Sequence, residues 1–368
     1  MKDKIAPVTK RIPCLDGIRA ISITLVFLAH FVGTVHHELP GPVLYCKEMG
    51  NLGVRTFFVI SGFLITTLLI SEYRKTGTIS LLKFYFNRTF RIFPAFYAFI
   101  IVMAIANALG YISLREGDML HAVTYTTNYH YDRAWELGHL WSLAVEEQFY
   151  LLWPAMFLLF GMRGALFGST AYIIVGPVIR ILTWHYLPHD REGIGESFQT
   201  VADSIATGCV FAFVKARLDE SPLFTGIQKN RLTIICLILL IAALNHLKGY
   251  ISFMYPIGET ALNLSVVLSI DWCLRNSNSL LGRFLNAAPI AFIGVLSYSL
   301  YLWQQPFLSR NSHSFVASSP VNLICAFSCA LVSFYLVEKP FLGIRGMVAR
   351  KWSAKKTQAI MVGTSVPD

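Results

Sequence analysis

The chain has 368 residues, of which 55% are apolar and only 14% are charged, and its mean hydropathy is +0.54. These values exclude an ordinary soluble protein and predict an integral membrane protein. The formal net charge of +10 does not indicate a nucleic-acid partner, because no basic stretch is interleaved with aromatic residues as in RNA-binding modules.

Ten apolar stretches of about membrane-spanning length follow one another along the chain. We place them at residues 15–33, 52–70, 92–110, 139–160, 164–182, 197–214, 232–247, 257–274, 287–306 and 320–338. The first is too long for the apolar region of a signal peptide and has no small-residue cleavage site, so it should remain as a helix. The sequence therefore predicts an all-α polytopic integral membrane protein with about ten transmembrane helices.

Lysine and arginine are distributed unevenly between the two sets of loops. If the N-terminus is cytoplasmic, the loops on the opposite side contain few basic residues, namely Lys47, Arg115, Arg133, Arg191, Lys248 and Arg310. Because basic residues are retained on the cytoplasmic side, we predict that both termini of this multi-pass cell-membrane protein are cytoplasmic. We expect one transmembrane domain over residues 1–345, followed by a basic, disordered cytoplasmic tail over residues 346–368.

The first apolar stretch, "LDGIRAISITLVFLAHFVG", has Asp16 and Arg19 near one end and His30 near the other. A charged side chain in the middle of a membrane helix costs about 2.5–3.5 kcal/mol, so it normally has a function. On an α-helix, residues eleven apart differ by about 20° in direction and about 16 Å in height. Arg19 and His30 therefore lie on one stripe, with Asp16 within about 40° of it, which favours a functional site over a structural pair.

The next polar groups occur in and after the second stretch. Ser61 lies at mid-membrane beside a glycine, where small residues allow close helix contact. Arg55, near the outer end, is either a snorkelling anchor or a ligand of a molecule bound on the outer side. After this stretch, "FYFNRTFRIFP" places Arg88 and Arg91 one turn apart at the cytoplasmic mouth. These two arginines either set the topology or, together with Arg19, form a multidentate anion site.

Two adjacent glutamates occur in "HLWSLAVEEQFYLLWP", at the start of the fourth stretch. His139, Ser142 and Tyr150 share one helix face with Glu146, whereas Glu147 points about 100° away. Only one carboxylate can face a cavity squarely, and the other should be paired with a neighbouring helix or protonated. An interhelical hydrogen-bond network is the alternative interpretation of these glutamates.

The ninth stretch ends with "LSYSLYLWQQP", which brings Tyr298, Tyr301, Trp303 and Gln304 to its outer end. An aromatic belt at the membrane surface is the simplest interpretation of the tyrosines and the tryptophan. We also expect the last three of these residues, together with Trp141 of the fourth stretch, to support a site at this end.

These segments together resemble the membrane-bound acyltransferase-3 family, whose members decorate bacterial polysaccharides and related molecules. The matching pieces are "LDGIRA" with His30 eleven residues beyond Arg19, then "GVRTFFVISGFLI", "RTFRIFP", "HLWSLAVEEQFYLLWP", "LSYSLYLW" and "VEKPF". They occur in order from Leu15 to Phe341, so the resemblance covers nearly the whole chain. It implies ten membrane helices with cytoplasmic termini and the transfer of an acyl group.

The resemblance also implies roles for residues at the two ends of the first stretch. Arg19 and His30 match the Arg-x10-His motif of the family, and His30 is the expected catalytic histidine. Arg88 and Arg91 match the Arg-x-x-Arg motif, which is associated with handling of the acyl-CoA donor. We assign Asp16, which lies close to Arg19 on the same stripe, to the donor side as well.

Glu146 and Glu147 match the paired glutamates of the family and are expected to take part in catalysis by orienting the histidine or stabilising its charged form. The chain departs from the family at Gln304, where many members have a histidine. Glutamine cannot act as an acid or base, so proton transfer at this position is not expected. The residues assigned to the acceptor side or to support of the site are Arg55, Ser61, His139, Trp141, Ser142, Tyr150, Tyr301, Trp303 and Gln304.

The implied reaction moves an acyl group, by default acetyl from cytoplasmic acetyl-CoA, to a hydroxyl of a carbohydrate or lipid-linked glycan. O-antigen of lipopolysaccharide, exopolysaccharide and lipo-oligosaccharide all stay open as acceptors. Beyond the acyl-CoA co-substrate and membrane lipid we expect no bound cofactor, and the scattered cysteines lack the spacing of a metal site. A secondary transporter or flippase-like protein with an intramembrane His, Glu and Arg site is the alternative.

Overall fold

The computed structural model describes residues 12–32, 34, 48–309, 312 and 314–349. Within these ranges the regular secondary structure is entirely helical, without a strand, so the predicted all-α fold is confirmed. The predicted tail falls largely on residues 350–368, which lie outside the described residues, as does the N-terminal segment before Ile12. The placement of both termini in the cytoplasm stays a prediction.

Long helices form a bundle, and short helical segments join them. The long helices are α1 (Leu15–Val32), α3 (Gly50–Thr76), α4 (Leu81–Ala108), α7 (Leu140–Tyr186), α8 (Phe198–Glu220), α10 (Arg231–His246), α12 (Glu259–Arg275), α14 (Ala288–Phe307) and α15 (Val321–Ser333). The short segments are α5 (Asp118–Val123), η2 (Thr127–Tyr129), α6 (Trp135–Gly138), η3 (Pro188–Gly195), α9 (Pro222–Lys229), η4 (Leu247–Gly249), α11 (Ile251–Phe253), η5 (Met254–Gly258), α13 (Leu280–Asn286), η6 (Phe315–Ala317) and η7 (Phe334–Glu338).

Within the described residues, eight helices are long and apolar enough to cross a membrane, or nine when α13 and α14 count as one bent span. The difference from the predicted ten arises in α7. The stretches 139–160 and 164–182 both lie in α7, which is interrupted at Gly161, where φ is 64° and ψ is −172°. Glycine adopts this left-handed conformation without steric cost. The break divides α7 into two apolar segments, as the two predicted stretches expect. The count of eight or nine includes α7 only once and therefore does not contradict the predicted ten, and the chain is a multi-pass membrane protein.

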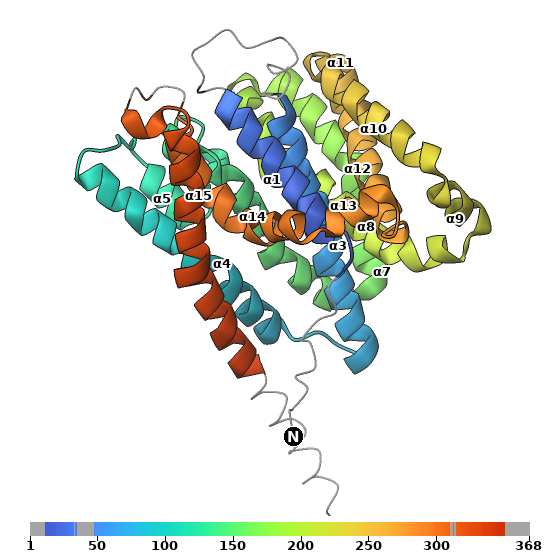
Figure 1. Cartoon of the computed structure of the whole chain (residues 1–368). Helices are drawn as coiled ribbons and strands as arrows, with labels where there is room; N and C mark the ends of the chain where they lie inside the picture. Colours follow the sequence, from blue (N-terminus) through green and yellow to red (C-terminus); the bar gives the residue numbers. More distant parts are fainter. Residues whose placement is uncertain (1–11, 33, 35–47, 310–311, 313, 350–368) are drawn as a thin grey trace, which may run out of the picture.

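Helix α1 lies in the middle of the bundle, between α15 on one side and α10 on the other (Figure 1). Two glycines bring it against α13 and α14. A Cβ on Gly17 would lie 2.2 Å from the carbonyl oxygen of Leu285, and a Cβ on Gly294 would lie 1.8 Å from that of Asp16. No side chain fits at either position, so the start of α1 is held directly against the backbone of its neighbours.

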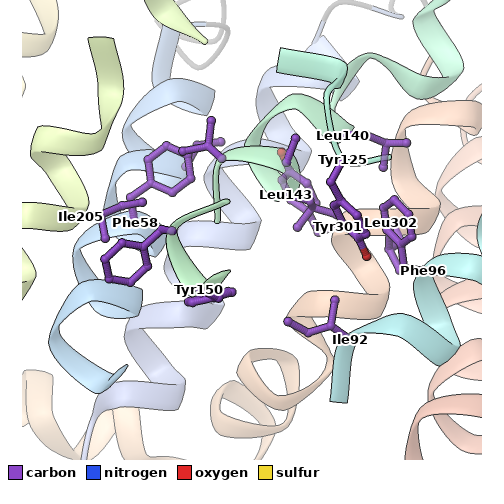
Figure 2. Packing of buried hydrophobic residues seen from close by; sticks show 14 of the residues in the cluster. Phe58, Ile92, Phe96, Tyr125, Leu140, Leu143, Tyr150, Ile205, Tyr301 and Leu302 are labelled. Atoms are coloured by element: carbon purple, nitrogen blue, oxygen red, sulfur yellow. The ribbon is translucent and has the colours of Figure 1, made fainter. Parts of the chain in front are cut away.

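The largest apolar cluster fills the space between α3, α4, α7 and α14. Phe96 stacks on Tyr125 with ring centroids 4.2 Å apart, and Figure 2 shows both beside Tyr301 and Leu302. On the outside of the bundle, large apolar side chains such as Leu159 and Phe167 of α7 stay exposed. Exposed apolar surface of this kind marks contact with lipid in a membrane protein.

Candidate active site

A cavity of about 470 Å³ lies among α1, α3, α6, α7, η3 and α14, and His30 lines it. We call this end of the bundle the His30 end and the opposite end the Arg19 end. Both residues belong to the single helix α1, so they are separated by about 16 Å along its axis. His139, Trp141 and Tyr301 line the same cavity. The stripe predicted on α1 therefore reaches a cavity at one of its ends.

The imidazole of His30 is hydrogen-bonded to Gln304 of α14. The distance from His30 Nδ1 to Gln304 Oε1 is 2.7 Å, and Gln304 is fully buried. Because a carbonyl oxygen can only accept, Nδ1–H donates, and the neutral ring then has its lone pair on Nε2. The ring of Trp135 stands edge-on to the imidazole, with centroids 5.4 Å apart. Gln304 and Trp135 thus define the orientation of the ring.

Next to this pair, α7 and α14 exchange further hydrogen bonds. Tyr301 Oη lies 2.6 Å from Ser142 Oγ and donates to the carbonyl oxygen of His139 at 3.0 Å. The His139 ring stands edge-on to that of Tyr301, with centroids 5.4 Å apart. These three residues, assigned from the sequence to the supporting side, are brought together beside His30.

The prediction of an aromatic belt at the end of the ninth stretch is wrong. Tyr301 and Trp303 are buried, and Trp303 stands edge-on to Phe99 of α4 with centroids 5.3 Å apart. Tyr298 Oη donates to the carbonyl oxygen of Ile92 at 3.0 Å. The physical reason is that α14 packs against α1, α4 and α15 together, so these side chains point into the protein instead of toward the membrane surface.

The paired glutamates lie closer to the middle of the bundle. Glu146 accepts hydrogen bonds from Ser61 Oγ at 2.8 Å and from Tyr150 Oη at 3.0 Å. Arg88 lies 4.0 Å from a carboxylate oxygen of Glu146 and 4.0 Å from one of Glu147. Its guanidinium carbon is 3.3 Å from the centroid of the Tyr150 ring. A single arginine of α4 therefore lies near the carboxylates of both glutamates of α7.

Both glutamates approach Arg88 of the neighbouring helix α4, so the expected pairing of one glutamate with a neighbouring helix is observed. Neither Glu146 nor Glu147 is among the residues that line the cavity. Glu146 is seven residues from His139, so it lies about 10 Å further along α7 toward the Arg19 end. A hydrogen bond of the His30 ring goes to Gln304, and the role of either glutamate in orienting the imidazole stays a prediction. The alternative of an interhelical hydrogen-bond network fits the contacts of Glu146.

At the Arg19 end, basic side chains gather around one buried acid. Arg91 lies within electrostatic range of Arg19, Arg88, Arg345 and Glu338, and a carboxylate oxygen of Glu338 accepts a hydrogen bond from Ser299 Oγ at 3.0 Å. Arg88 and Arg91 lie inside α4, which begins at Leu81, so they are one helical turn apart as predicted. The proximity of Arg19 to Arg91 agrees with the predicted grouping of these arginines.

The proposed donor residue Asp16 lies in the first turn of α1. A carboxylate in this position stabilises the positive end of the helix dipole. Its main chain is also in direct contact with α14 at Gly294. Asp16 is therefore part of the packing that holds α1 in place.

Arg55 is neither a snorkelling anchor nor part of the cavity lining. It is buried and lies 2.6 Å from Glu259 of α12. Glu259 is in turn 3.4 Å from Arg180, which is 2.9 Å from Asp203 of α8. Asn263 donates to Asp203 at 3.3 Å. We call these five residues the buried ion-pair network, and they join α3, α7, α8 and α12. The apolar packing of these helices leaves Arg55 no route to the lipid headgroups.

Several residues of the site have no signal in the sequence. Arg133 and Glu196 line the cavity from two loops and form an ion pair across 63 residues of chain. Trp135 lines it from α6. By contrast, Arg180, Asp203 and Glu259 could have been found, because a charge in an apolar stretch is the same signal that singled out Glu146.

Comparisons with known proteins identify the family of the chain. A family model described as an acyltransferase domain matches residues 12–338. The peptidoglycan O-acetyltransferase OatA of Listeria monocytogenes is 27% identical over 361 residues, covering 90% of this chain and 56% of the relative. The O-acetyltransferase OatA of Staphylococcus aureus is 30% identical over 365 residues, covering 89% and 57% respectively. No solved structure matches the chain.

The chain spans a little over half the length of these relatives, so similarity is established for the membrane-embedded part that contains His30. The family model covers every helix from α1 to η7 and ends at Glu338, the buried acid at the Arg19 end. The chain therefore belongs to the acyltransferase-3 family of membrane proteins.

Proposed function

We propose that the protein is a membrane O-acyltransferase that moves acetyl from cytoplasmic acetyl-CoA to a hydroxyl of a carbohydrate acceptor on the opposite side of the membrane. The observation that carries this proposal is the placement of His30, hydrogen-bonded to Gln304 and lining a cavity, on the same helix as Arg19. The family and the names of the relatives support acyl transfer to oxygen.

The donor is proposed to bind with its phosphates at the Arg19 end. Coenzyme A is a polyanion, and its phosphates match arginines better than any other group of the bundle. Arg88 is already balanced by two glutamates, so Arg19 and Arg91 are the better candidates. The uncharged pantetheine arm would extend toward His30, over the distance of about 16 Å that corresponds to a separation of eleven positions along the helix.

His30 is proposed as the general base. Its Nε2 takes the proton of the acceptor hydroxyl while the hydroxyl oxygen attacks the thioester carbonyl carbon. The bond between carbon and sulfur then breaks, and the coenzyme A thiolate leaves and receives the proton from the imidazolium. Positioned general-base catalysis contributes about 10² to 10⁴ in rate. A route through an acyl-histidine uses the same nitrogen, and trapping of labelled acetyl on the protein distinguishes it from direct transfer.

Glycans of the bacterial envelope are the proposed acceptors. One relative is named for peptidoglycan, and O-antigen, exopolysaccharide and lipo-oligosaccharide carry the same type of hydroxyl. In a Gram-negative cell the protein would lie in the inner membrane. Mass spectrometry of envelope glycans from cells with and without the protein identifies which of them carries the additional acetyl group.

Labelled acetyl-CoA, incubated with membranes that contain the full chain, tests the proposal. The wild-type protein should transfer the label covalently to glycan, and His30→Ala should lower transfer by about 10²-fold or more at an equal level of inserted protein. His185→Ala serves as a matched control, because His185 is exposed at the far end of α7. Full transfer by His30→Ala overturns the mechanism, and solute uptake without covalent transfer supports a transporter instead.

A further inference from the structure

One wall of the His30 cavity is made by an ion pair from two loops. Arg133, just before α6, pairs with Glu196, just after η3. Arg133 is 10% exposed and Glu196 is 27% exposed, so the pair is only partly screened by solvent. Both residues line the cavity. Because His30 lines the same cavity, a bound acceptor has to lie against this pair.

The guanidinium of Arg133 has little left to offer a ligand. Its Nε donates to the carbonyl oxygen of Gly138 at 3.2 Å, and its Nη1 donates to that of His130 at 2.7 Å. Its Nη2 makes the contact with Glu196. Each of the three nitrogens therefore already has a protein oxygen as partner, and the charge is balanced by a carboxylate.

The remaining charge on the cavity wall is negative. Glu192 also lines the cavity and is exposed, so the acidic groups outnumber Arg133. An acceptor with a carboxylate or phosphate close to its reacting hydroxyl would meet this negative wall, and among the described lining residues the one arginine, Arg133, is already paired with Glu196. Like charges at close range disfavour binding and therefore select against such partners.

Aromatic side chains make up another part of the wall. Trp135, Trp141 and Tyr131 line the cavity, and Trp135 is held in place because its Nε1 donates to the carbonyl oxygen of Gln305 at 3.0 Å. Indole and phenol rings combine an apolar face with a polar edge. An uncharged sugar ring has the complementary chemistry, because its C–H groups form apolar patches and its hydroxyls lie at the rim.

From these observations we infer that the Arg133–Glu196 pair makes the cavity selective for an uncharged sugar ring and excludes acceptors with a negative charge near the reacting hydroxyl. This inference rests on the proposed function, since it assigns the cavity to the acceptor. The pair acts on specificity, while His30 acts on the chemistry. Removing either member should therefore change which sugar binds.

Equilibrium binding of two sugars to the full chain in nanodiscs of zwitterionic lipid tests the inference. The probes are a neutral tetramer of β-linked glucose and a tetramer of equal length that contains one glucuronate. The wild-type protein should bind the neutral tetramer about tenfold or more tightly, and Glu196→Gln should reduce this ratio about fivefold by leaving Arg133 without its carboxylate. Arg133→Gln should increase the ratio, because it leaves Glu196 without its cation.

Loss of folding would change the affinity ratio in the same direction in both variants. Opposite changes of the ratio therefore report on the charges of the pair. Asp132→Asn is the matched control, because Asp132 pairs with Arg115 in the same loop region, is 85% exposed and is not among the residues that line the cavity. It should leave the ratio unchanged. An unchanged ratio in both variants, a wild-type preference for the glucuronate tetramer, or no saturable binding of either sugar overturns the inference. Acetyl transfer from labelled acetyl-CoA is measured in parallel, so that loss of the proposed function is recognised separately.

Discussion

Two groups of charged residues lie inside the bundle, and they differ in how completely their charges are matched. In the buried ion-pair network, Arg180 and Asp203 are fully buried and 2.9 Å apart. Around Arg88, the side chains are 14–19% exposed and the two ion-pair distances are both 4.0 Å. The first group joins four helices through close ion pairs. The second is looser and lies between the cavity and the Arg19 end.

The comparison teaches that a charge in an apolar stretch has two distinct outcomes. A closed pair is expensive to break, because the remaining partner stays buried without compensation. A half-buried pair costs less to change and can respond to a ligand. Substitutions in the buried ion-pair network should therefore affect stability. Substitutions between His30 and Arg91, including the group around Arg88, should affect turnover.

The largest expected effect is on stability. Asp203→Ala removes the closest partner of the buried Arg180, leaving only the longer contact to Glu259 at 3.4 Å, and should cost about 3–5 kcal/mol of unfolding free energy. Thermal unfolding in detergent measures this cost. Asp219→Ala is the control, because Asp219 is 44% exposed where it pairs with Lys215 and Arg275, and it should cost at most about 1 kcal/mol. Equal losses in both variants would remove the distinction between the two groups.

The second effect concerns the donor. Arg91→Ala should raise the KM for acetyl-CoA about tenfold or more, since a hydrogen bond to a charged group contributes about 1.5–3 kcal/mol. The KM for the acceptor should not change. Initial rates at varied acetyl-CoA and fixed glycan provide the measurement, with Lys229→Ala of α9 as a basic control outside the site. An unchanged donor KM would reassign Arg91 to membrane topology.

A smaller effect is expected at Gln304, which we treat as a positioning residue. Gln304→Leu removes the acceptor of the His30 Nδ1–H bond and should lower kcat about five- to tenfold, in line with about 1 kcal/mol for a neutral hydrogen bond. The KM values should stay constant. Gln304→Glu keeps an acceptor oxygen and should restore most of the rate. A folded Gln304→Leu variant of normal kcat would show that the bond has no catalytic role.

The smallest effect is expected at Ser61, which contacts Glu146. Ser61→Ala removes one hydrogen bond to Glu146 and one from Tyr150, and should cost about 1 kcal/mol of stability. Because the Arg88 contacts remain, acetyl transfer should fall less than in Gln304→Leu. Paired unfolding and rate measurements rank the two variants. A loss of activity as large as that of His30→Ala would place Ser61 in the reaction itself.

Most of the fold could be predicted because each long helix contains a continuous apolar run, which hydropathy detects directly. The break at Gly161 and the bend of 56° between α13 and α14 are local backbone events that hydropathy does not distinguish from loops. Arg88 and Arg91 were placed before the apolar stretch 92–110, and α4 includes them because it begins at Leu81, eleven residues ahead of that stretch. Basic residues at a membrane surface look alike in a helix and in a loop.

Helical periodicity could predict contacts of the candidate site only where the residues lie on one helix. The alignment of Arg19 with His30 follows from helical periodicity alone. The partners of His30, Gln304 and Trp135, come from elements far apart in the chain, and the Arg133–Glu196 pair joins two loops. Tertiary packing decides these contacts, and no periodic pattern encodes them.

The continuity of α1 has a consequence for what the protein can tolerate. One residue inserted between Arg19 and His30 would turn the imidazole by about 100° around the helix axis, away from Gln304. Four inserted residues would nearly restore its direction but would displace it by about 6 Å along the axis. Gly17 and Gly294 leave the lower part of the helix no room to compensate by sliding. Length variation between these two residues should therefore be forbidden, while the loops that line the cavity remain free to change length with the acceptor.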